Sequence, residues 1–136
     1  MPNEATEIFK KPAIYITEAD YDALSPLISA ANGDDTADFL ADEIERAIRV
    51  TSDVGGSFVK LGSCVVFKDL ATGVLREVQL TMPKDADISA SRVSVLAPVG
   101  ASLIGLTEKS RFQWIGADGK IRELEVVSIQ DPKLAA

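Results

Sequence analysis

Histidine is absent from this sequence of 136 residues, and cysteine occurs once, as Cys64. Without histidine the chain cannot build a Ser-His-Asp or Cys-His catalytic centre or a histidine-ligated metal site. One cysteine forms neither an internal disulfide nor a thiolate zinc site. Cys64 precedes an apolar run with no base beside it, so we expect an unreactive thiol. The composition therefore excludes these catalytic centres and metal sites, and the leading hypothesis reached below requires no catalytic residue, metal or cofactor.

Positive charge is scarce in the first part of the chain. Residues 1–52 hold eleven acidic and four basic side chains, a charge of −7, whereas residues 53–136 are neutral. A chain with this charge and no basic stripe repels a phosphate backbone. We therefore expect no direct binding to free nucleic acid.

Long apolar runs are also missing. No stretch approaches the roughly 18 residues that cross a bilayer, and the polar start lacks the charged-then-apolar order of a secretory signal. We expect a cytoplasmic monomer without membrane association, in which residues 1–12 form a flexible lead.

Residues 13–52 predict a short acidic hairpin of two antiparallel helices after a brief β-prone run at 13–16. Residues 17–20 form a capping box in which Asp20 reaches back to the helix start. Pro26 predicts a kink, or a restart capped by Ser25. After a turn at 32–35, Asp35 or Thr36 is expected to cap the second helix. Its predicted apolar face consists of Ala37, Leu40, Ile44, Ala47 and Ile48.

Apolar residues alternate with period two from Phe58 onward, which predicts strands. The expected strands cover 63–68, 78–82, 92–96, 111–115 and 120–129, the last with a bulge near 126–127. Pro83 ends the second strand before a polar loop, and Pro98 opens a short apolar helix within 97–106. The predicted fold is α+β: the helical hairpin, then an antiparallel sheet packed on that short helix.

Residues 93–106 read V-S-V-L-A-P-V-G-A-S-L-I-G-L, and Trp114 and a glycine turn at 119 follow. This block resembles the C-terminal domain of the bacterial Gre transcript-cleavage factors, whose version reads roughly I-S-V-L-S-P-I-G-x-A-L-L-G-L. With the hairpin in front, residues 13–129 are similar to the Rnk branch (regulator of nucleoside diphosphate kinase) of that superfamily. The resemblance implies an FKBP-like fold for residues 53–136.

Two positions depart from the family pattern. The family has Gly-Asp after the short helix where this chain has Lys109 and Ser110, so that turn must differ or be strained. The family also has serine where this chain has Ala97, which removes a hydroxyl from the strand-to-helix junction.

The resemblance implies that this junction docks on the rim of the secondary channel of RNA polymerase. The implied docking residues are Leu96, Ala97, Pro98, Val99 and Gly100. Pro98 would rigidify the junction and Gly100 would permit close backbone approach. A purely structural role, with Pro98 starting a helix and Val99 packing under the sheet, is an equal alternative for residues 96–98.

The acids Asp34, Asp35 and Asp38 would lie at the hairpin tip. In Gre factors, tip acids on a long coiled coil reach the polymerase active centre and help to hold Mg²⁺. The simpler interpretation is favoured here: Asp34 shapes the turn, Asp35 caps the helix and Asp38 complements its dipole. Arms of roughly 14 residues reach only about 21 Å, so we predict no stimulation of transcript cleavage.

The leading hypothesis is a regulator that binds core RNA polymerase near the secondary channel and competes there with Gre factors. One alternative is an active cleavage factor that uses the tip acids. A second is a prolyl isomerase with an aromatic pocket around Phe112 and Trp114, although fold similarity alone transfers no activity. The effect on nucleoside diphosphate kinase in the family name would be an indirect result of altered transcription.

Overall fold

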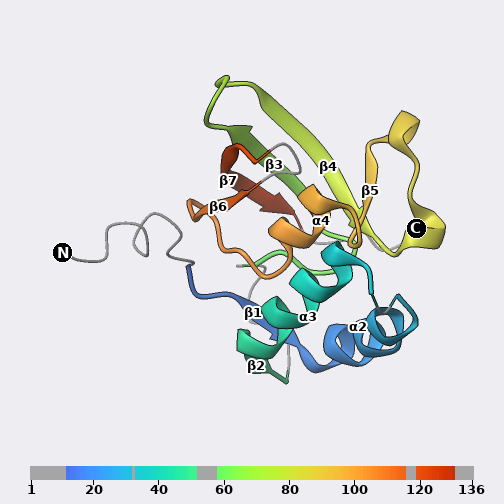
Figure 1. Cartoon of the computed structure of the whole chain (residues 1–136). Coiled ribbons are helices and arrows are strands. Elements are labelled where there is room, and N and C mark those ends of the chain that lie inside the picture. The colour runs from blue at the N-terminus through green and yellow to red at the C-terminus, as the bar shows by residue number, and fades with distance from the viewer. Residues whose placement is uncertain (1–11, 32, 52–57, 116–118, 131–136) are drawn as a thin grey trace, which may run out of the picture.

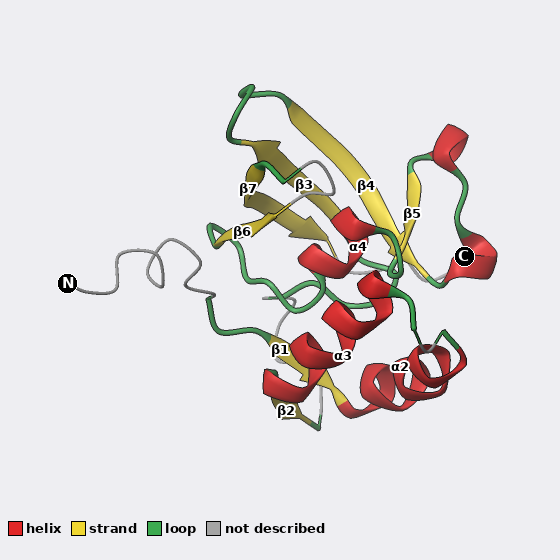
Figure 2. Ribbon diagram, in the orientation of Figure 1, coloured by secondary structure: helices red, strands yellow, loops and turns green. Residues whose placement is uncertain are grey.

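The computed structural model describes residues 12–31, 33–51, 58–115 and 119–130. A small unit of two strands and two helices packs against a five-stranded sheet that carries one short α-helix (Figures 1 and 2). Most of the predicted flexible lead, and the predicted boundary at residues 52–53, lie outside the described residues. The α+β architecture predicted from the sequence is confirmed.

The first unit runs from strand to helix to helix to strand. It consists of β1 (Tyr15–Thr17), α2 (Glu18–Ala30), α3 (Asp35–Arg46) and β2 (Ile48–Val50). The two helices carry the chain back to the side of β1, where β2 pairs in parallel. This second strand was not predicted, and the extension of the helix face to Ala47 and Ile48 was wrong. Ile48 instead donates its N–H to Ile14 at 2.9 Å.

Two details of α2 differ from the sequence prediction. The Thr17 hydroxyl accepts from the Asp20 N–H at 3.1 Å, as the capping box requires, but the Asp20 carboxylate accepts from the distant Leu61 N–H instead of reaching back. Pro26 does not restart the helix, which runs unbroken from Glu18 to Ala30. Pro26 is exposed, so the backbone carbonyl that loses its donor lies on the solvent side.

The sheet has the order β5-β4-β3-β7-β6. Its strands are β3 (Cys64–Asp69), β4 (Leu75–Thr81), β5 (Arg92–Ser94), β6 (Arg111–Ile115) and β7 (Ile121–Gln130). The predicted all-antiparallel pairing was wrong at one edge, because β4 and β5 are parallel. Two 3₁₀ turns, η1 (Pro83–Asp85) and η2 (Ile88–Ala90), lie in the crossover that returns the chain between them. The predicted bulge is confirmed by a register shift opposite Val66 and Phe67.

Helix α4 (Pro98–Leu103) is the centre of the core, and residues 100–106 are all buried. Figure 1 shows α4 between the sheet and α3, and apolar side chains of α3 belong to the same core cluster. A Cβ on Gly100 would lie 2.0 Å from the Ser94 carbonyl oxygen. Gly105 has a φ of +84°, and a Cβ there would lie 2.8 Å from the Tyr15 carbonyl oxygen. Both glycines are therefore required by close backbone approach.

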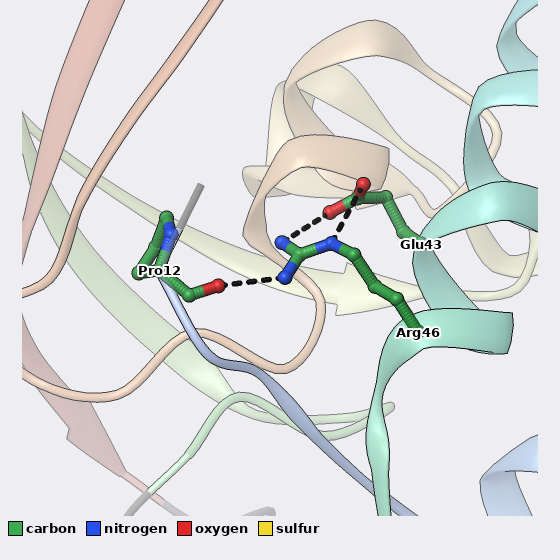
Figure 3. Close-up of polar contacts among 3 residues, drawn as sticks. All are labelled: Pro12, Glu43 and Arg46. Atoms are coloured by element: carbon green, nitrogen blue, oxygen red, sulfur yellow. Dashed lines mark hydrogen bonds and ion pairs between the residues drawn. The ribbon is translucent and has the colours of Figure 1, made fainter. Parts of the chain in front are cut away.

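An ion pair between Glu43 and Arg46 lies at the C-terminal end of α3 (Figure 3). The Arg46 guanidinium donates to both carboxylate oxygens of Glu43, at 2.8 and 3.1 Å, and to the Pro12 carbonyl oxygen at 2.8 Å. Glu43 is only 2% exposed, so this bidentate pairing offsets the cost of burying its charge. The end of α3 is thereby tied to the chain that enters β1.

We expect Gly100→Ala to lower the free energy of unfolding by about 3 kcal/mol, because the added methyl group has to displace the backbone of Ser94. Gly73→Ala is the matched control: a Cβ there meets nothing within 4 Å, and only its φ of +77° is unfavourable, at a cost of about 1 kcal/mol. Urea denaturation followed by circular dichroism measures both. Equal losses would contradict the close approach at Gly100.

Candidate docking surface and acidic turn

The junction between β5 and α4 is a turn held by its own backbone. The Ser94 hydroxyl accepts from the Leu96 N–H at 2.9 Å, and the Ser94 carbonyl accepts from the Ala97 N–H at 3.0 Å. Pro98 occupies the first turn of α4, as predicted, where its missing N–H costs nothing. These bonds stabilise the turn at residues 94–97 that leads into α4.

The five predicted docking residues differ in exposure. Pro98 is exposed, and Leu96, Ala97 and Val99 are half-buried. Gly100 is buried against Ser94. Residues 96–99 can therefore contact another molecule, whereas Gly100 supports the turn from below.

A cavity of about 320 Å³ opens beside this junction. Its apolar lining includes Phe67, Val78, Val93, Val99 and Leu124. Asp69, Arg76 and Arg122 are among the charged residues that line it. Val99 belongs both to the junction and to the cavity, so the two form one continuous surface.

The first acid of the predicted hairpin tip, Asp34, has a structural role. Asp34, not Asp35 or Thr36 as predicted, caps α3, and its Oδ2 accepts from the Ala37 N–H at 3.0 Å. Asp35 and Asp38 lie exposed in the first helical turn, where negative charge complements the helix dipole. Over the described ranges, no group of three or more acidic or cysteine side chains is arranged to hold a metal ion.

The two helices are short and lie against the sheet domain. Helix α2 has 13 residues and α3 has 12, which gives lengths of about 20 and 18 Å. Leu40 and Ile44 of α3 lie in the common core, and α3 packs on α4. The acidic turn therefore stays close to the body of the protein.

Asp20 connects the helical unit to the sheet domain. Its Oδ2 accepts from the Leu61 N–H at 3.0 Å. Burial raises the pKa of the Asp20 carboxyl above its ordinary value, while the Leu61 hydrogen bond and the charge of Lys60 act in the opposite direction. The folded protein thus holds the Asp20 proton more tightly than an ordinary aspartate does, although the contact itself needs only an oxygen acceptor.

A second, wider concavity of about 730 Å³ lies beside the crossover between β4 and β5. Its lining is mainly polar, and some of its charged side chains interact with one another or with the backbone of the crossover. Arg92 lies 3.7 Å from Asp87 and donates to the Asp85 carbonyl oxygen at 3.2 Å. This surface carries no apolar floor comparable to that of the first cavity.

The aromatic pocket expected for a prolyl isomerase is not formed by Phe112. Phe112 is 1% exposed and packs edge-on against Phe39, with ring centroids 5.9 Å apart. The side chain of Trp114 lies outside the described residues. In the smaller cavity Phe67 is the one aromatic side chain of the described lining.

Residues 54–131 match the family model described as transcription elongation factor GreA/GreB, C-terminal, and residues 12–50 match the Rnk N-terminus. The chain belongs to the Rnk branch of the GreA/GreB family. It is 31% identical over 123 residues to the regulator of nucleoside diphosphate kinase of Escherichia coli K12, a match that covers 88% of this chain and 90% of that protein.

Other members of the family are similar over different lengths. GreA of Azorhizobium caulinodans is 33% identical over 92 residues, which cover 67% of this chain and 58% of that protein. A solved structure of a prokaryotic GreA/GreB elongation factor from Nitrosomonas europaea superposes with a TM-score of 0.69 at 29% identity. That superposition covers 88% of this chain and 98% of the other.

Both departures from the Gre pattern have visible consequences. Lys109 adopts a φ of +71°, a left-handed conformation that costs a lysine more than the glycine of the Gre pattern. Ala97 is the N-cap of α4 and provides no side-chain hydrogen bond, whereas the family's serine is a good capping residue. No helix in the described part of the chain is long and apolar enough to span a membrane.

We expect Asp34→Ala to destabilise the protein by about 1 kcal/mol, because α3 loses its N-cap. Asp34→Asn keeps a capping oxygen and should be nearly neutral. Asp35→Asn removes only a charge near the helix dipole and should cost a few tenths of a kcal/mol. Thermal unfolding of the three variants tests this order, and equal effects of Asp34→Ala and Asp35→Asn would contradict the assigned cap.

We expect Asp20→Asn to be at least as stable as the wild type at pH 7, because asparagine keeps the acceptor for Leu61 without a buried charge. The raised pKa of Asp20 means that the wild type gains stability relative to this variant as the pH falls through the folded pKa. That gain is complete below the ordinary aspartate pKa of 3.8, where the carboxyl is protonated in both the folded and the unfolded state.

Asp20→Ala is the second arm of this experiment. It removes the acceptor and should cost about 1–2 kcal/mol at any pH, because the Leu61 N–H loses its partner. Urea titrations at pH 4 and pH 7 measure all three proteins. A wild type that becomes more stable than Asp20→Asn as the pH rises would contradict the raised pKa.

Proposed function

We propose that this protein binds core RNA polymerase near the rim of the secondary channel and competes there with Gre factors, without catalysing a reaction. Family membership supports this partner, because residues 54–131 match the C-terminal domain of GreA/GreB. In the Gre factors that the chain resembles, this domain is the part that docks. The monomeric state and the units 13–52 and 53–136 are part of the same proposal.

The observation that carries the proposal is the rigid junction at residues 96–99. Pro98 is exposed at its apex, and the Ser94 hydrogen bonds fix the turn before any partner arrives. A preformed turn loses little conformational entropy on binding. The cavity beside Val99 offers an apolar depression that an exposed part of a partner can fill.

The proposed mechanism is occupancy of the site. The sheet domain supplies the contact surface, and the excess charge of −7 in residues 1–52 orients the protein in the field of its partner. Such steering weakens as salt screens the charges. Binding should therefore weaken as the ionic strength rises.

Transcript cleavage by the tip acids is the second candidate, and the structure gives it little support. Asp34 is engaged as a helix cap, and the helices are only about 18–20 Å long. A prolyl isomerase is supported still less, since Phe112 is buried. The name of the Escherichia coli relative refers to nucleoside diphosphate kinase, and we interpret such an effect in this protein as an indirect result of altered transcription.

The test is retention of core RNA polymerase on the immobilised protein at 50 and 500 mM salt, repeated with excess GreA as competitor. We expect the immobilised protein to retain polymerase at low salt and to retain less at high salt. Excess GreA should release the polymerase, because under this proposal both proteins bind the same surface of it. Pro98→Glu, which puts a charge at the apex of the junction, should reduce retention. Lys84→Glu, at the distant crossover between β4 and β5, is the control. Absence of retention at low salt would refute the proposal.

A backtracked elongation complex separates the first candidate from the second. We expect no RNA cleavage above background on addition of this protein, and inhibition of the cleavage that GreA stimulates. Cleavage that is lost in Asp35→Asn and Asp38→Asn would instead favour the second candidate.

A further inference from the structure

The two edges of the five-stranded sheet differ in how far the chain's own backbone occupies them. At the β5 edge the main chains of Asp87 and Arg92 exchange two hydrogen bonds of 2.9 Å, and the Ser94 carbonyl oxygen accepts from the Ala97 N–H at 3.0 Å. The crossover and the junction thus bind main-chain groups along β5. The other edge is β6, the outermost strand on that side (Figure 2).

The register of β6 against β7 shows which of its main-chain groups point outward. Hydrogen-bonded and non-hydrogen-bonded pairs alternate along antiparallel strands. The Glu123 carbonyl oxygen accepts from the Leu70 N–H at 3.0 Å, on the β3 side of β7. Gln113 lies opposite Glu123, and Arg111 lies opposite Glu125, so both direct their N–H and C=O groups away from β7. Within the described ranges no hydrogen bond reaches these groups from outside the sheet.

A row of outward N–H and C=O groups on a strand is a template for one more strand. Proteins commonly protect such an edge with proline or lysine, and β6 contains neither. An extended polypeptide segment satisfies the donors and acceptors of alternate residues together, because its own groups repeat with the same period. The edge of β6 therefore has the geometry for strand addition.

Helix α3 determines the charge beside one face of this edge. Phe39 of α3 packs edge-on against Phe112 of β6, with ring centroids 5.9 Å apart. Asp35 and Asp42 precede and follow Phe39 by four and three residues, so they share its side of the helix, and both are exposed. Side chains of an added strand that point toward α3 therefore meet negative charge.

The other face of the edge offers less to a charged side chain. The Arg111 Nε lies 3.9 Å from the Glu125 Oε1, so its charge already has a partner. Gln113, the next residue on this face, is uncharged. The two sets of alternate side chains on an added strand thus meet different surroundings.

We propose that the open edge of β6 binds an extended, basic segment of a protein partner, which adds one strand to the sheet. Its basic side chains face Asp35 and Asp42, with their apolar stems over Phe39, and its alternate, uncharged side chains lie beside Gln113. A second copy of this chain fits less well, because pairing of β6 with β6 would bring together two units that each carry −7 in residues 1–52.

The test uses an eight-residue peptide of alternating lysine and valine, labelled at its N-terminus and followed by fluorescence anisotropy at 50 mM salt. Gln113→Pro removes the central outward N–H without removing a bond to β7, and we expect it to weaken binding about tenfold. Gln113→Ala keeps that N–H and is the matched control, with a loss of less than twofold. Asp42→Asn should weaken binding about threefold, because one charge pair is lost.

Matched peptides separate main-chain pairing from charge. A peptide of the same sequence, N-methylated at every second residue so that the edge facing β6 has no N–H donors, should bind at least tenfold more weakly. A peptide of alternating glutamate and valine should not bind. On the wild-type protein, the saturating lysine peptide should slow hydrogen exchange of the Gln113 amide about tenfold. Thermal unfolding establishes that each variant is folded, and the peptide series and the exchange measurement need no variant.

The outcomes decide the assignment without reference to polymerase, since the docking junction lies at the opposite edge of the sheet. Equal affinities of Gln113→Pro and Gln113→Ala, equal binding of the methylated peptide, or no binding of the lysine peptide would overturn strand addition. Tighter binding of the glutamate peptide would overturn the basic occupant. Dimers in sedimentation that Gln113→Pro abolishes, with no peptide bound, would assign the edge to a second copy instead.

Discussion

The burial of residues 100–106, which form most of α4 and the segment after it, is the constraint on which the rest of the structure depends. The helix lies between the sheet and α3, and its backbone approaches β5 at Gly100, where a Cβ would lie 2.0 Å from the Ser94 oxygen. Just beyond its end, Gly105 also approaches the backbone of Tyr15, where a Cβ would lie 2.8 Å from the carbonyl oxygen, and the Tyr15 N–H donates to the Gly105 carbonyl oxygen at 3.1 Å. One short segment therefore holds the sheet domain and the helical unit together, and the junction at residues 96–99 leads directly into it.

Local patterns in the sequence predict those parts of the fold that local interactions determine. The alternation that defines β3 and β4, the capping of α2 by Thr17 and the bulge in β7 all belong to this class. The parallel pairing of β4 with β5 and the strand β2 do not, because each requires a partner distant in the chain. Ile48 extends the helical spacing of Leu40 and Ile44, and only its pairing with β1 makes it a strand residue.

The candidate site likewise contains features that local sequence indicates and features that depend on contacts between distant residues. The junction at residues 96–99 was identified only through the resemblance to Gre factors, since its composition alone equally suits a helix start. The cavity could not be predicted, because its lining residues on β3, β4 and β7 are far apart in the chain and come together only through the strand order β4-β3-β7. Glu43 was missed because a charged residue on a helix is usually exposed, and only the Arg46 pairing makes its burial favourable.

The packing of the helical unit favours the proposed competition for a binding site over the alternative, transcript cleavage by the tip acids. The cleavage role that the resemblance implies would require an arm whose end extends away from the body of the protein. Here Leu40 and Ile44 of α3 are buried in the common core, and Asp20 is bonded to the sheet domain at Leu61. Extending the arm would expose those side chains, at roughly 25 cal/mol for each Å² of apolar surface, and would break that bond. The same contacts that stabilise the fold thus keep the acids of the turn close to the body of the protein.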